Sequence, residues 1–241
     1  MNPVRFYCNP IYRPVAELDG SEAHHLAQVL RLKCGDKVEL FDGAGSLATA
    51  TVATVGSRKV ALNVDDLQVV PAPDGQRIII AASIAKGERF DWLIGKCTEL
   101  GADRICPVLF ERTVKQPRNP RTAERWRNII IAAAKQCRRL FLPRIDNPLS
   151  LLDTLASLKS DFPNGRILLG SISPGSPAIS NQSFGAADVI AFVGPEGGLT
   201  EQEEILLREN GAEPARLADT VLRIETAAVA FAAILSAQRI L

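Results

Sequence analysis

From residue 78 onward, short apolar runs alternate with segments of helical periodicity, and this alternation limits the fold more than any other feature. Five runs are typical of buried strands: Ile78–Ile84, Ile105–Phe110, Ile167–Leu169, Val189–Val193 and Ala215–Ala218. The predicted helices are Arg89–Leu100, Thr122–Arg139, Glu201–Asn210 and Thr226–Ile240. Strands that are apolar throughout and separated by helices predict a parallel sheet covered on both faces, which is an α/β fold.

The first 70 residues follow a different pattern, in which short alternating stretches are separated by turn signals such as Asp42-Gly43. The stretches are Val4–Tyr7, Lys37–Phe41, Leu47–Val55 and Lys59–Val70. They predict a small antiparallel barrel, interrupted by one helix with Ser21 as its N-cap. Two prolines and an Asp-Gly pair then indicate a linker. We therefore expect a domain at residues 1–70, a linker at 71–76 and a second domain at 77–241.

The N-terminal segment MNPVRFYCNP lacks the apolar run of a secretory signal, and the longest apolar run, Ala227–Leu235, is too short to span a bilayer. The five cysteines are scattered and include no CxxC pair, which favours reduced thiols over disulfides or a zinc site. His24 and His25 are adjacent, so on a helix they would point in different directions and would not easily share a metal ion. We expect a cytoplasmic protein with no membrane span and no bound metal.

Basic residues are concentrated in one window. Between Arg112 and Arg144 there are ten lysines and arginines and one acid, Glu124, although the formal net charge of the chain is only +1. The helix predicted there is amphipathic, with Trp126 and Ile130 on its buried side. The window is either a solvated helix face or a surface for an anionic partner, most simply a nucleic-acid backbone.

The sequence GPEGGL at residues 194–199 joins a predicted buried strand to a helix that Thr200 and Glu203 begin with capping-box spacing. The loop therefore lies at the carboxyl edge of the parallel sheet, where ligands bind in such folds. No lysine follows the glycines, Glu196 would repel phosphate, and the chain contains no GxGxxG, so phosphate-binding and dinucleotide fingerprints are absent. Exposed amides with one carboxylate suit a polar ligand with amines or hydroxyls. For this loop alone, a tight turn with a solvent-facing glutamate is the alternative.

A second strand, turn and helix follow in RLADTVLRIETAAVAFAAIL, residues 216–235. Arg223 and Glu225 lie at the helix start among apolar residues. Buried charges are costly unless they are paired. These two residues therefore form either a salt bridge or a functional site. The helix beyond them is apolar all round, so it must be buried within its domain or between its domain and a second subunit.

Together, GPEGG and the downstream LRIETA resemble motifs of the RsmE family of SPOUT-class methyltransferases, which methylate N3 of a uridine in bacterial 16S ribosomal RNA. The resemblance extends along nearly the whole chain, through RFY, HHLAQVLRLKCGDKVELFDG, KCTELGADRICPVLFERT and RWRNIIIAAAKQCRRLFLPRI. The chain departs from the family pattern at Ala218, where glycine is usual, and in Ala132–Ala134, where a glutamate is common. The first change would add a methyl group beside the cofactor, and the second concerns an RNA or dimer role rather than the cofactor site.

The resemblance implies an α/β fold made of a C-terminal SPOUT domain with a deep trefoil knot and a small N-terminal PUA-like β-barrel for RNA. It also implies S-adenosylmethionine as cofactor, the small ribosomal subunit and its RNA as partner, and a homodimer. The cofactor residues expected are Leu169, Gly170, Gly194, Pro195, Glu196, Gly197, Gly198, Leu217, Ala218, Val221, Leu222, Thr226 and Ala227. The RNA-contacting residues expected are Arg5, Arg13, Arg31, Arg112, Arg118, Arg121, Arg125 and Arg139.

N3 of uracil is protonated at neutral pH, so its methylation needs a group that removes the proton or stabilises the resulting anion. Arg223 is expected to stabilise the anion, and Glu225 or Glu196 to orient the base or accept the proton. Two alternatives stay open. The first is a SPOUT methyltransferase acting on another RNA such as a transfer RNA, which a panel of unmethylated RNAs would distinguish. The second is a catalytically silent RNA-binding protein of the same fold, which calorimetry with S-adenosylmethionine would distinguish.

Overall fold

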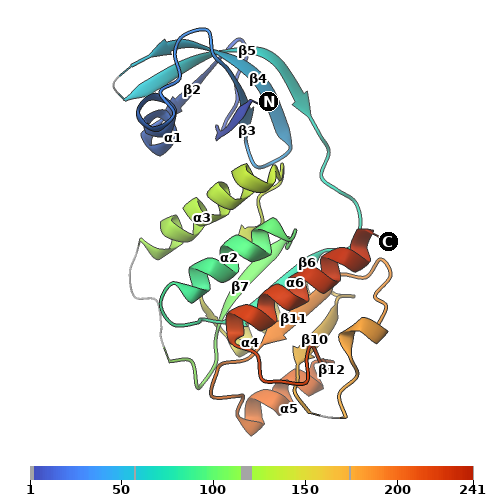
Figure 1. The fold of residues 1–241 in the computed structure, drawn as a ribbon. Coiled ribbons are helices and arrows are strands. Elements are labelled where there is room, and N and C mark those ends of the chain that lie inside the picture. The colour runs from blue at the N-terminus through green and yellow to red at the C-terminus, as the bar shows by residue number, and fades with distance from the viewer. Residues whose placement is uncertain (1–2, 57, 115–120, 174, 241) are drawn as a thin grey trace. The chain divides into compact units, whose positions relative to one another are not determined.

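The computed structural model describes residues 3–56, 58–114, 121–173 and 175–240. The chain forms two compact units (Figure 1). The first comprises Met1–Pro73 with Ala134–Leu142, and the second comprises Asp74–Ala133 with Pro143–Leu241. The helix α3 (Thr122–Cys137) therefore contributes its last turn to the first unit and the rest to the second. The domain boundaries expected at residues 70 and 77 stay a prediction.

The N-terminal unit is built on a five-stranded sheet with the order β1-β3-β4-β5-β2. Its strands are β1 (Val4–Tyr7), β2 (Val15–Asp19), β3 (Lys37–Phe41), β4 (Ser46–Val55) and β5 (Lys59–Val69). The expectation of a wholly antiparallel sheet is wrong at one pair, because β1 and β3 run parallel. A long connection that contains β2 and the helical segment joins these two strands, and only such a connection permits parallel pairing. The sequence analysis also missed β2.

The core of this unit collects alternate side chains from every strand. Phe6, Leu18, Leu40 and Leu62 are fully buried, as is Leu26 of the helical segment. That segment consists of α1 (Gly20–His24) and a π-helical turn (His25–Val29). Its N-cap is Asp19 rather than the expected Ser21, because the extended backbone of Asp19 ends β2 and the helix begins directly at Gly20.

The C-terminal unit contains the predicted parallel sheet, whose order is β12-β10-β11-β6-β7-β8, with β9 paired to β7. The strands are β6 (Ile78–Ser83), β7 (Arg104–Leu109), β8 (Arg144–Ile145), β9 (Leu149–Ser150), β10 (Arg166–Gly170), β11 (Val189–Val193) and β12 (Glu213–Ala215). The helices, besides α3, are α2 (Arg89–Glu99), α4 (Leu151–Asp161), α5 (Glu201–Glu209) and α6 (Ile224–Ile240), with a 3-10 turn at Ile179–Asn181. Every strand pair in this sheet is parallel.

Helices cover both faces of this sheet (Figure 1). On one face, Leu155 of α4 and Leu207 of α5 join a core cluster with Ile79, Val108 and Phe192 of the strands. On the other, α6 packs against β6 and β11, and α2 lies beside α6. The sequence analysis missed α4, although Ser150 caps it by accepting a hydrogen bond from the backbone N–H of Asp153.

The amphipathic character predicted for α3 is confirmed, since Trp126 and Ile130 are buried. The ring of Trp126 lies 5.1 Å from that of Phe90 on α2, measured between centroids. A methyl group built on Gly95 of α2 would lie 3.7 Å from Cγ2 of Ile129, which is an ordinary contact, so α2 and α3 pack against each other at this position.

Candidate active site

The three segments expected to bind the cofactor meet at one edge of the sheet. β12, β10 and β11 are neighbours and run parallel, so their carboxyl ends lie together. Leu169 and Gly170 end β10, the loop 194–198 follows β11, and the loop 217–222 follows β12. In α/β sheets this edge is where ligands bind, because the connecting loops there leave backbone groups available.

The loop after β11 is tightly turned and docked on its own helix. The backbone N–H of Gly198 donates to the carbonyl of Pro195 at 2.9 Å, and Gly198 has a φ of +73°, which favours glycine. A methyl group built on Gly194 would lie 3.1 Å from Cδ2 of Leu199, which is tighter than an ordinary contact. The predicted capping box of Thr200 and Glu203 is confirmed, so the loop passes straight into α5.

Arg112, which follows β7, holds this loop in place. Its Nη1 donates to the carbonyl oxygen of Gly197 at 2.9 Å and to that of Leu199 at 3.2 Å. The preceding residue, Glu111, donates its backbone N–H to Oε1 of Glu203 at 2.7 Å. Arg112 was expected to contact RNA, and in the structure it is exposed while its guanidinium donates to the glycine loop. Its contact with RNA stays a prediction.

The loop after β10 runs beside the strand end of β12. The backbone N–H of Ser171 donates to the carbonyl of Ala215 at 3.0 Å, and Ile179 donates to Arg216 at the same distance. A methyl group built on Gly170 would lie 3.3 Å from the Phe231 ring of α6 and 3.5 Å from the carbonyl oxygen of Phe192. The Phe231 ring therefore already fills the space beside Gly170 on the side of α6, and a side chain at residue 170 would have little room.

The segment between β12 and α6 carries the second predicted motif. Arg216 pairs with Asp219 at 2.6 Å, whereas Val221 is 78% exposed. Leu217, Ala218 and Leu222 are half-buried, Arg223 and Thr226 are exposed, and Ala227 is buried. The backbone N–H of Ala227 donates to the carbonyl of Arg223, so the first turn of α6 begins there. Arg223 therefore presents its charge to solvent at this edge.

Glu225 behaves differently from Arg223, because its side chain is buried. The residue is 7% exposed, and Oε2 has no hydrogen-bond partner within the described part of the chain. Oε1 lies 3.9 Å from Nε of Arg89, the first residue of α2. Nη1 of the same arginine donates to Oε1 of Glu196 at 2.9 Å. The sequence analysis missed Arg89. No local sequence signal marks it, because its hydrogen-bond partner Glu196 lies 107 residues away in the chain.

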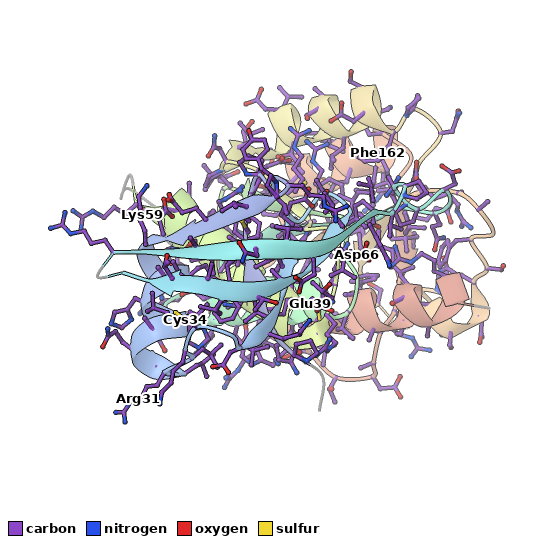
Figure 2. All side chains as sticks on the ribbon, turned by 90° about the horizontal axis from the view of Figure 1, so that it is seen from above. Arg31, Cys34, Glu39, Lys59, Asp66 and Phe162 are labelled. Atoms are coloured by element: carbon purple, nitrogen blue, oxygen red, sulfur yellow. The ribbon has the colours of Figure 1, made fainter. Side chains whose placement is uncertain are left out.

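The other arginines expected to contact RNA differ in how available they are. Arg5 is only 8% exposed and forms an ion pair with Glu39 on the neighbouring strand, so this charge belongs to the interior of the N-terminal unit. Arg13 is exposed and donates to the carbonyl of Asp65 at 2.9 Å. Arg31 is exposed and its side chain points away from the N-terminal unit (Figure 2). We exclude Arg5 from the proposed RNA surface for this reason.

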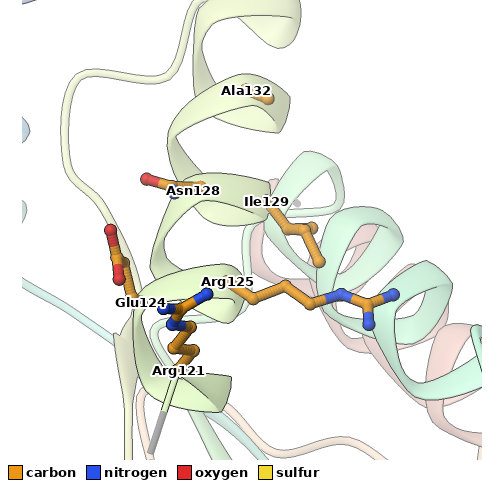
Figure 3. Close-up of a pocket in the computed structure, with 6 residues that line it drawn as sticks. All are labelled: Arg121, Glu124, Arg125, Asn128, Ile129 and Ala132. Atoms are coloured by element: carbon orange, nitrogen blue, oxygen red, sulfur yellow. The ribbon is translucent and has the colours of Figure 1, made fainter. Parts of the chain in front are cut away.

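The basic window itself is only partly described. Arg118 lies outside the described residues, and Arg139 is half-buried in the N-terminal unit, where its carbonyl accepts from Arg5 at 3.5 Å. Arg121 and Arg125 border a hollow of about 440 Å³ along α3. Its other lining residues are Glu124, Asn128, Ile129 and Ala132 (Figure 3). Arg125 extends from α3 to form an ion pair with Asp91 of α2.

The residues at the sheet edge fit S-adenosylmethionine. This cofactor carries an ammonium, a sulfonium, an adenine amine and ribose hydroxyls, and it has no phosphate. The edge offers two carboxylates, Glu196 and Glu225, and one oxygen of Glu225 is buried without a partner among the residues that the structure describes. A buried acceptor of this kind is costly unless a hydrogen-bond donor reaches it. The donor and charge pattern therefore matches a cationic, amine-bearing ligand.

Comparison with known proteins identifies the family. A family model described as an RNA methyltransferase domain matches residues 72–236, and one described as an RNA methyltransferase PUA domain matches residues 18–65. The "Ribosomal RNA small subunit methyltransferase E" of a Synechocystis species is 32% identical over 222 residues, which cover 90% of this chain and 71% of that protein. The chain belongs to the ribosomal RNA small subunit methyltransferase E family.

Other members of this family agree over most of their length. The Bacillus subtilis protein of the same name is 31% identical over 223 residues, covering 89% of this chain and 86% of the relative. Among solved structures, a putative methyltransferase from Legionella pneumophila in complex with bound SAM superposes with a TM-score of 0.89, at 29% identity and 98% coverage of both chains. A Neisseria gonorrhoeae member bound to S-adenosyl methionine gives 0.87, at 28% identity and the same coverage.

Two features are absent from the part of the chain that the structure describes. No helix in that part of the chain is long and apolar enough to cross a membrane. No group of three or more histidine, cysteine, aspartate or glutamate side chains is arranged there to hold a metal ion.

Proposed function

We propose that this family member transfers a methyl group from S-adenosylmethionine to N3 of a uridine in 16S ribosomal RNA of the small ribosomal subunit. The observation that carries the proposal is the meeting of three loops, after β10, β11 and β12, at the carboxyl edge of the sheet. The cytoplasmic location and the absence of a metal requirement belong to the same proposal.

The three loops would hold the cofactor mainly through backbone groups. Gly170 and Gly194 carry no side chain that would cover the backbone at the sheet edge, and Arg112 fixes the carbonyls of Gly197 and Leu199. When it is bound, S-adenosylmethionine supplies an electrophilic methyl group on a sulfonium and leaves as a neutral thioether. We also propose that the segments around these loops form the deep trefoil knot that the family resemblance implies.

Glu225 is the better candidate to accept the N3 proton. Glu196 is exposed and its Oε1 already accepts from Arg89. Glu225 is buried and keeps one oxygen without a partner among the described residues, so this carboxylate has an unused capacity to accept a proton at this edge. The proton passes from N3 to this carboxylate, and the nitrogen's electron pair forms the new bond to the methyl carbon.

Arg223 would stabilise the negative charge that develops on the uracil ring. Its side chain is exposed at the edge, two residues before Glu225, and is available to a base that arrives from solvent. A cation placed where charge develops in the transition state lowers the barrier more than it improves ground-state binding. The base must first be extracted from folded RNA, which is least costly for an unstacked nucleotide.

RNA recognition is proposed for two separate surfaces. In the N-terminal unit, Arg13 and Arg31 are exposed. In the C-terminal unit, Arg121 and Arg125 border the hollow on α3. Arginines at such positions contact phosphates and orient the RNA rather than read its sequence. Arg139 and Arg118 stay in the proposal as secondary contacts.

A homodimer is proposed through α6. Ala228, Phe231, Ala232 and Leu235 face the sheet and α2 and are fully buried. Four further apolar residues of the helix remain partly exposed in the single chain: Val229, Ala230, Ala233 and Ile234. A second copy placed on this stripe would cover it, as an interface between identical subunits requires.

The proposal is tested by offering purified protein and methyl-labelled S-adenosylmethionine to a panel of unmethylated RNAs. The panel contains free 16S RNA, small ribosomal subunits and transfer RNA. We expect label in 16S RNA, free or assembled, recovered as 3-methyluridine after digestion. Label in transfer RNA alone would redirect the activity to another RNA. Cofactor binding by calorimetry without transfer to any RNA would instead indicate a silent RNA-binding protein.

A further inference from the structure

Arg89 connects two carboxylates that are far apart in the sequence. Arg89 is the first residue of α2. Its side chain reaches Glu196 in the loop after β11 and Glu225 at the start of α6. The contact with Glu196 is a hydrogen bond of 2.9 Å, and the contact with Glu225 is an ion pair of 3.9 Å. One guanidinium thus links the loop proposed for the cofactor to the residue proposed to accept the proton.

The charges around Arg89 explain why this link matters. The Glu225 side chain is 9% exposed, and a buried carboxylate without a nearby cation is strongly destabilising. Arg89 is the one cation within ion-pair distance of Glu225 among the described residues. Because Arg89 is itself 43% exposed, its positive charge retains contact with water while it neutralises the buried group.

The geometry also distinguishes the two oxygens of Glu225. Arg89 approaches Oε1, whereas Oε2 is shielded from solvent and has no hydrogen-bond partner within the described chain. If Arg89 were absent, the carboxylate could rotate or exchange its oxygens, and no other cation among the described residues lies within ion-pair distance of it. Glu196 would at the same time lose the hydrogen bond that holds its side chain.

We propose that Arg89 is a positioning residue for methyl transfer, whose guanidinium holds the buried Glu225 carboxylate at the sheet edge, where it accepts the N3 proton of the target base. This inference rests on the proposed function. Arg89 does not touch the reacting atoms. It acts through Glu225. Its contact with Glu196 couples the Glu225 carboxylate to the loop proposed to hold the cofactor.

The test uses the full-length protein with three variants and a matched control. Arg89→Gln removes the charge, Arg89→Lys keeps the charge without the planar fork, and Glu225→Gln removes the proton acceptor. The control is Lys96→Gln, which deletes a positive charge on the same helix where its partner is Glu99. Calorimetry gives S-adenosylmethionine affinity, thermal unfolding reports folding, and methyl transfer to 16S RNA gives kcat and KM.

We expect Arg89→Gln to lower kcat about 100-fold, with less than a fivefold change in KM for RNA and in cofactor affinity. Arg89→Lys should recover part of kcat, and Lys96→Gln should match the wild type. The double variant Arg89→Gln/Glu225→Gln should be no slower than Glu225→Gln alone, because residues that act through one another are not additive.

Each outcome decides the proposal. Wild-type kcat in folded Arg89→Gln, or multiplicative losses in the double variant, would overturn the positioning role while leaving the proposed function intact. A loss that appears only in cofactor affinity would reassign Arg89 to cofactor binding. If Arg89→Gln unfolds, kcat of Arg89→Lys decides in its place, and a wild-type value overturns the role. Absence of both cofactor binding and transfer in the wild type would reject the proposed function itself.

Discussion

The guanidinium of Arg112 donates two hydrogen bonds, at 2.9 and 3.2 Å, to the carbonyl oxygens of Gly197 and Leu199 on the glycine loop. We expect Arg112→Ala to weaken S-adenosylmethionine binding about tenfold, since charge-assisted hydrogen bonds contribute about 1.5–3 kcal/mol each and the loop can partly relax. Calorimetry measures this. Arg208→Ala on α5, whose exposed partner is Glu204, is the control. If Arg112→Ala left the cofactor affinity unchanged and reduced the RNA affinity, the result would support contact with RNA as the main role of Arg112.

Gly197→Val tests whether the loop itself holds the cofactor. A methyl group at Gly197 would lie 3.5 Å from the Arg112 side chain, an ordinary contact, so the fold should tolerate the substitution. The branched side chain would nevertheless fill space at the sheet edge. We expect Gly197→Val to weaken cofactor binding at least 100-fold and Gly197→Ala to have an intermediate affinity. Neither substitution should change the unfolding temperature much. A folded valine variant with normal affinity would place the cofactor elsewhere.

The sequence predicted the parallel sheet and the position of the glycine loop because both depend on local signals. Apolar runs set the strands, and the Thr200–Glu203 capping box marked the end of the loop. The missed elements depend on distant partners. β2 pairs with β5, forty or more residues further along the chain, and the parallel pairing of β1 with β3 follows a long connection.

The same distinction applies to the site. GPEGG and LRIETA could be read from the sequence, but Arg89 could not, because its hydrogen-bond partner lies 107 residues away. Arg5 looked like a surface arginine until the register placed Glu39 opposite it on β3. Arg112 belongs to the basic window in the sequence, but its guanidinium donates hydrogen bonds to the glycine loop. Charge counts along the chain cannot distinguish an arginine that faces solvent from one that holds a carbonyl or a carboxylate.

The RNA surface predicts a change in salt dependence. Reversing Arg121, Arg125 and Arg139 together should weaken RNA binding and reduce the slope of log K against log salt by roughly 2, because each lost phosphate contact contributes about 0.7–0.9. Cofactor affinity should stay the same. Fluorescence anisotropy at several salt concentrations measures the slope. An unchanged slope would mean that these arginines form only a solvated face.

The partly exposed stripe on α6 predicts the oligomeric state. Ala230→Glu or Ala233→Glu would place a charge in an apolar contact, and we expect monomers or insoluble protein as a result. Light scattering on wild-type protein at micromolar concentration should show a dimer. A wild-type monomer under these conditions would contradict the dimer, although the cofactor site within each chain would be unaffected.

The buried cysteines predict a pH dependence. Burial raises the pKa of the Cys97 thiol to about 12, so the folded chain keeps a proton that the unfolded chain loses above about pH 9. The stability that this contributes is complete below about pH 9 and declines as the pH rises toward 12. We expect Cys97→Ala to have a shallower decline in the free energy of unfolding over that range. Equal slopes for the variant and the wild type would show that Cys97 does not titrate in this way.

Thiol reactivity provides an independent check on the same residues. Cys34 is exposed, whereas Cys97 and Cys106 are buried, with the pKa of Cys106 raised well above its usual value by burial. N-ethylmaleimide at pH 8 should therefore modify Cys34 quickly and leave Cys97 and Cys106 unmodified until the chain unfolds. Mass spectrometry of peptides locates the adducts. Rapid labelling of Cys97 in folded protein would contradict its burial.

The most direct test of the proposed function is mass-spectrometric mapping of 16S RNA from cells that have and lack this protein. The account predicts one 3-methyluridine that disappears when the protein is absent. It should return with the wild-type chain and fail to return with Glu225→Gln at equal expression. An identical modification pattern with and without the protein would contradict methylation of 16S RNA. A restored methyluridine in Glu225→Gln would contradict Glu225 as the required proton acceptor.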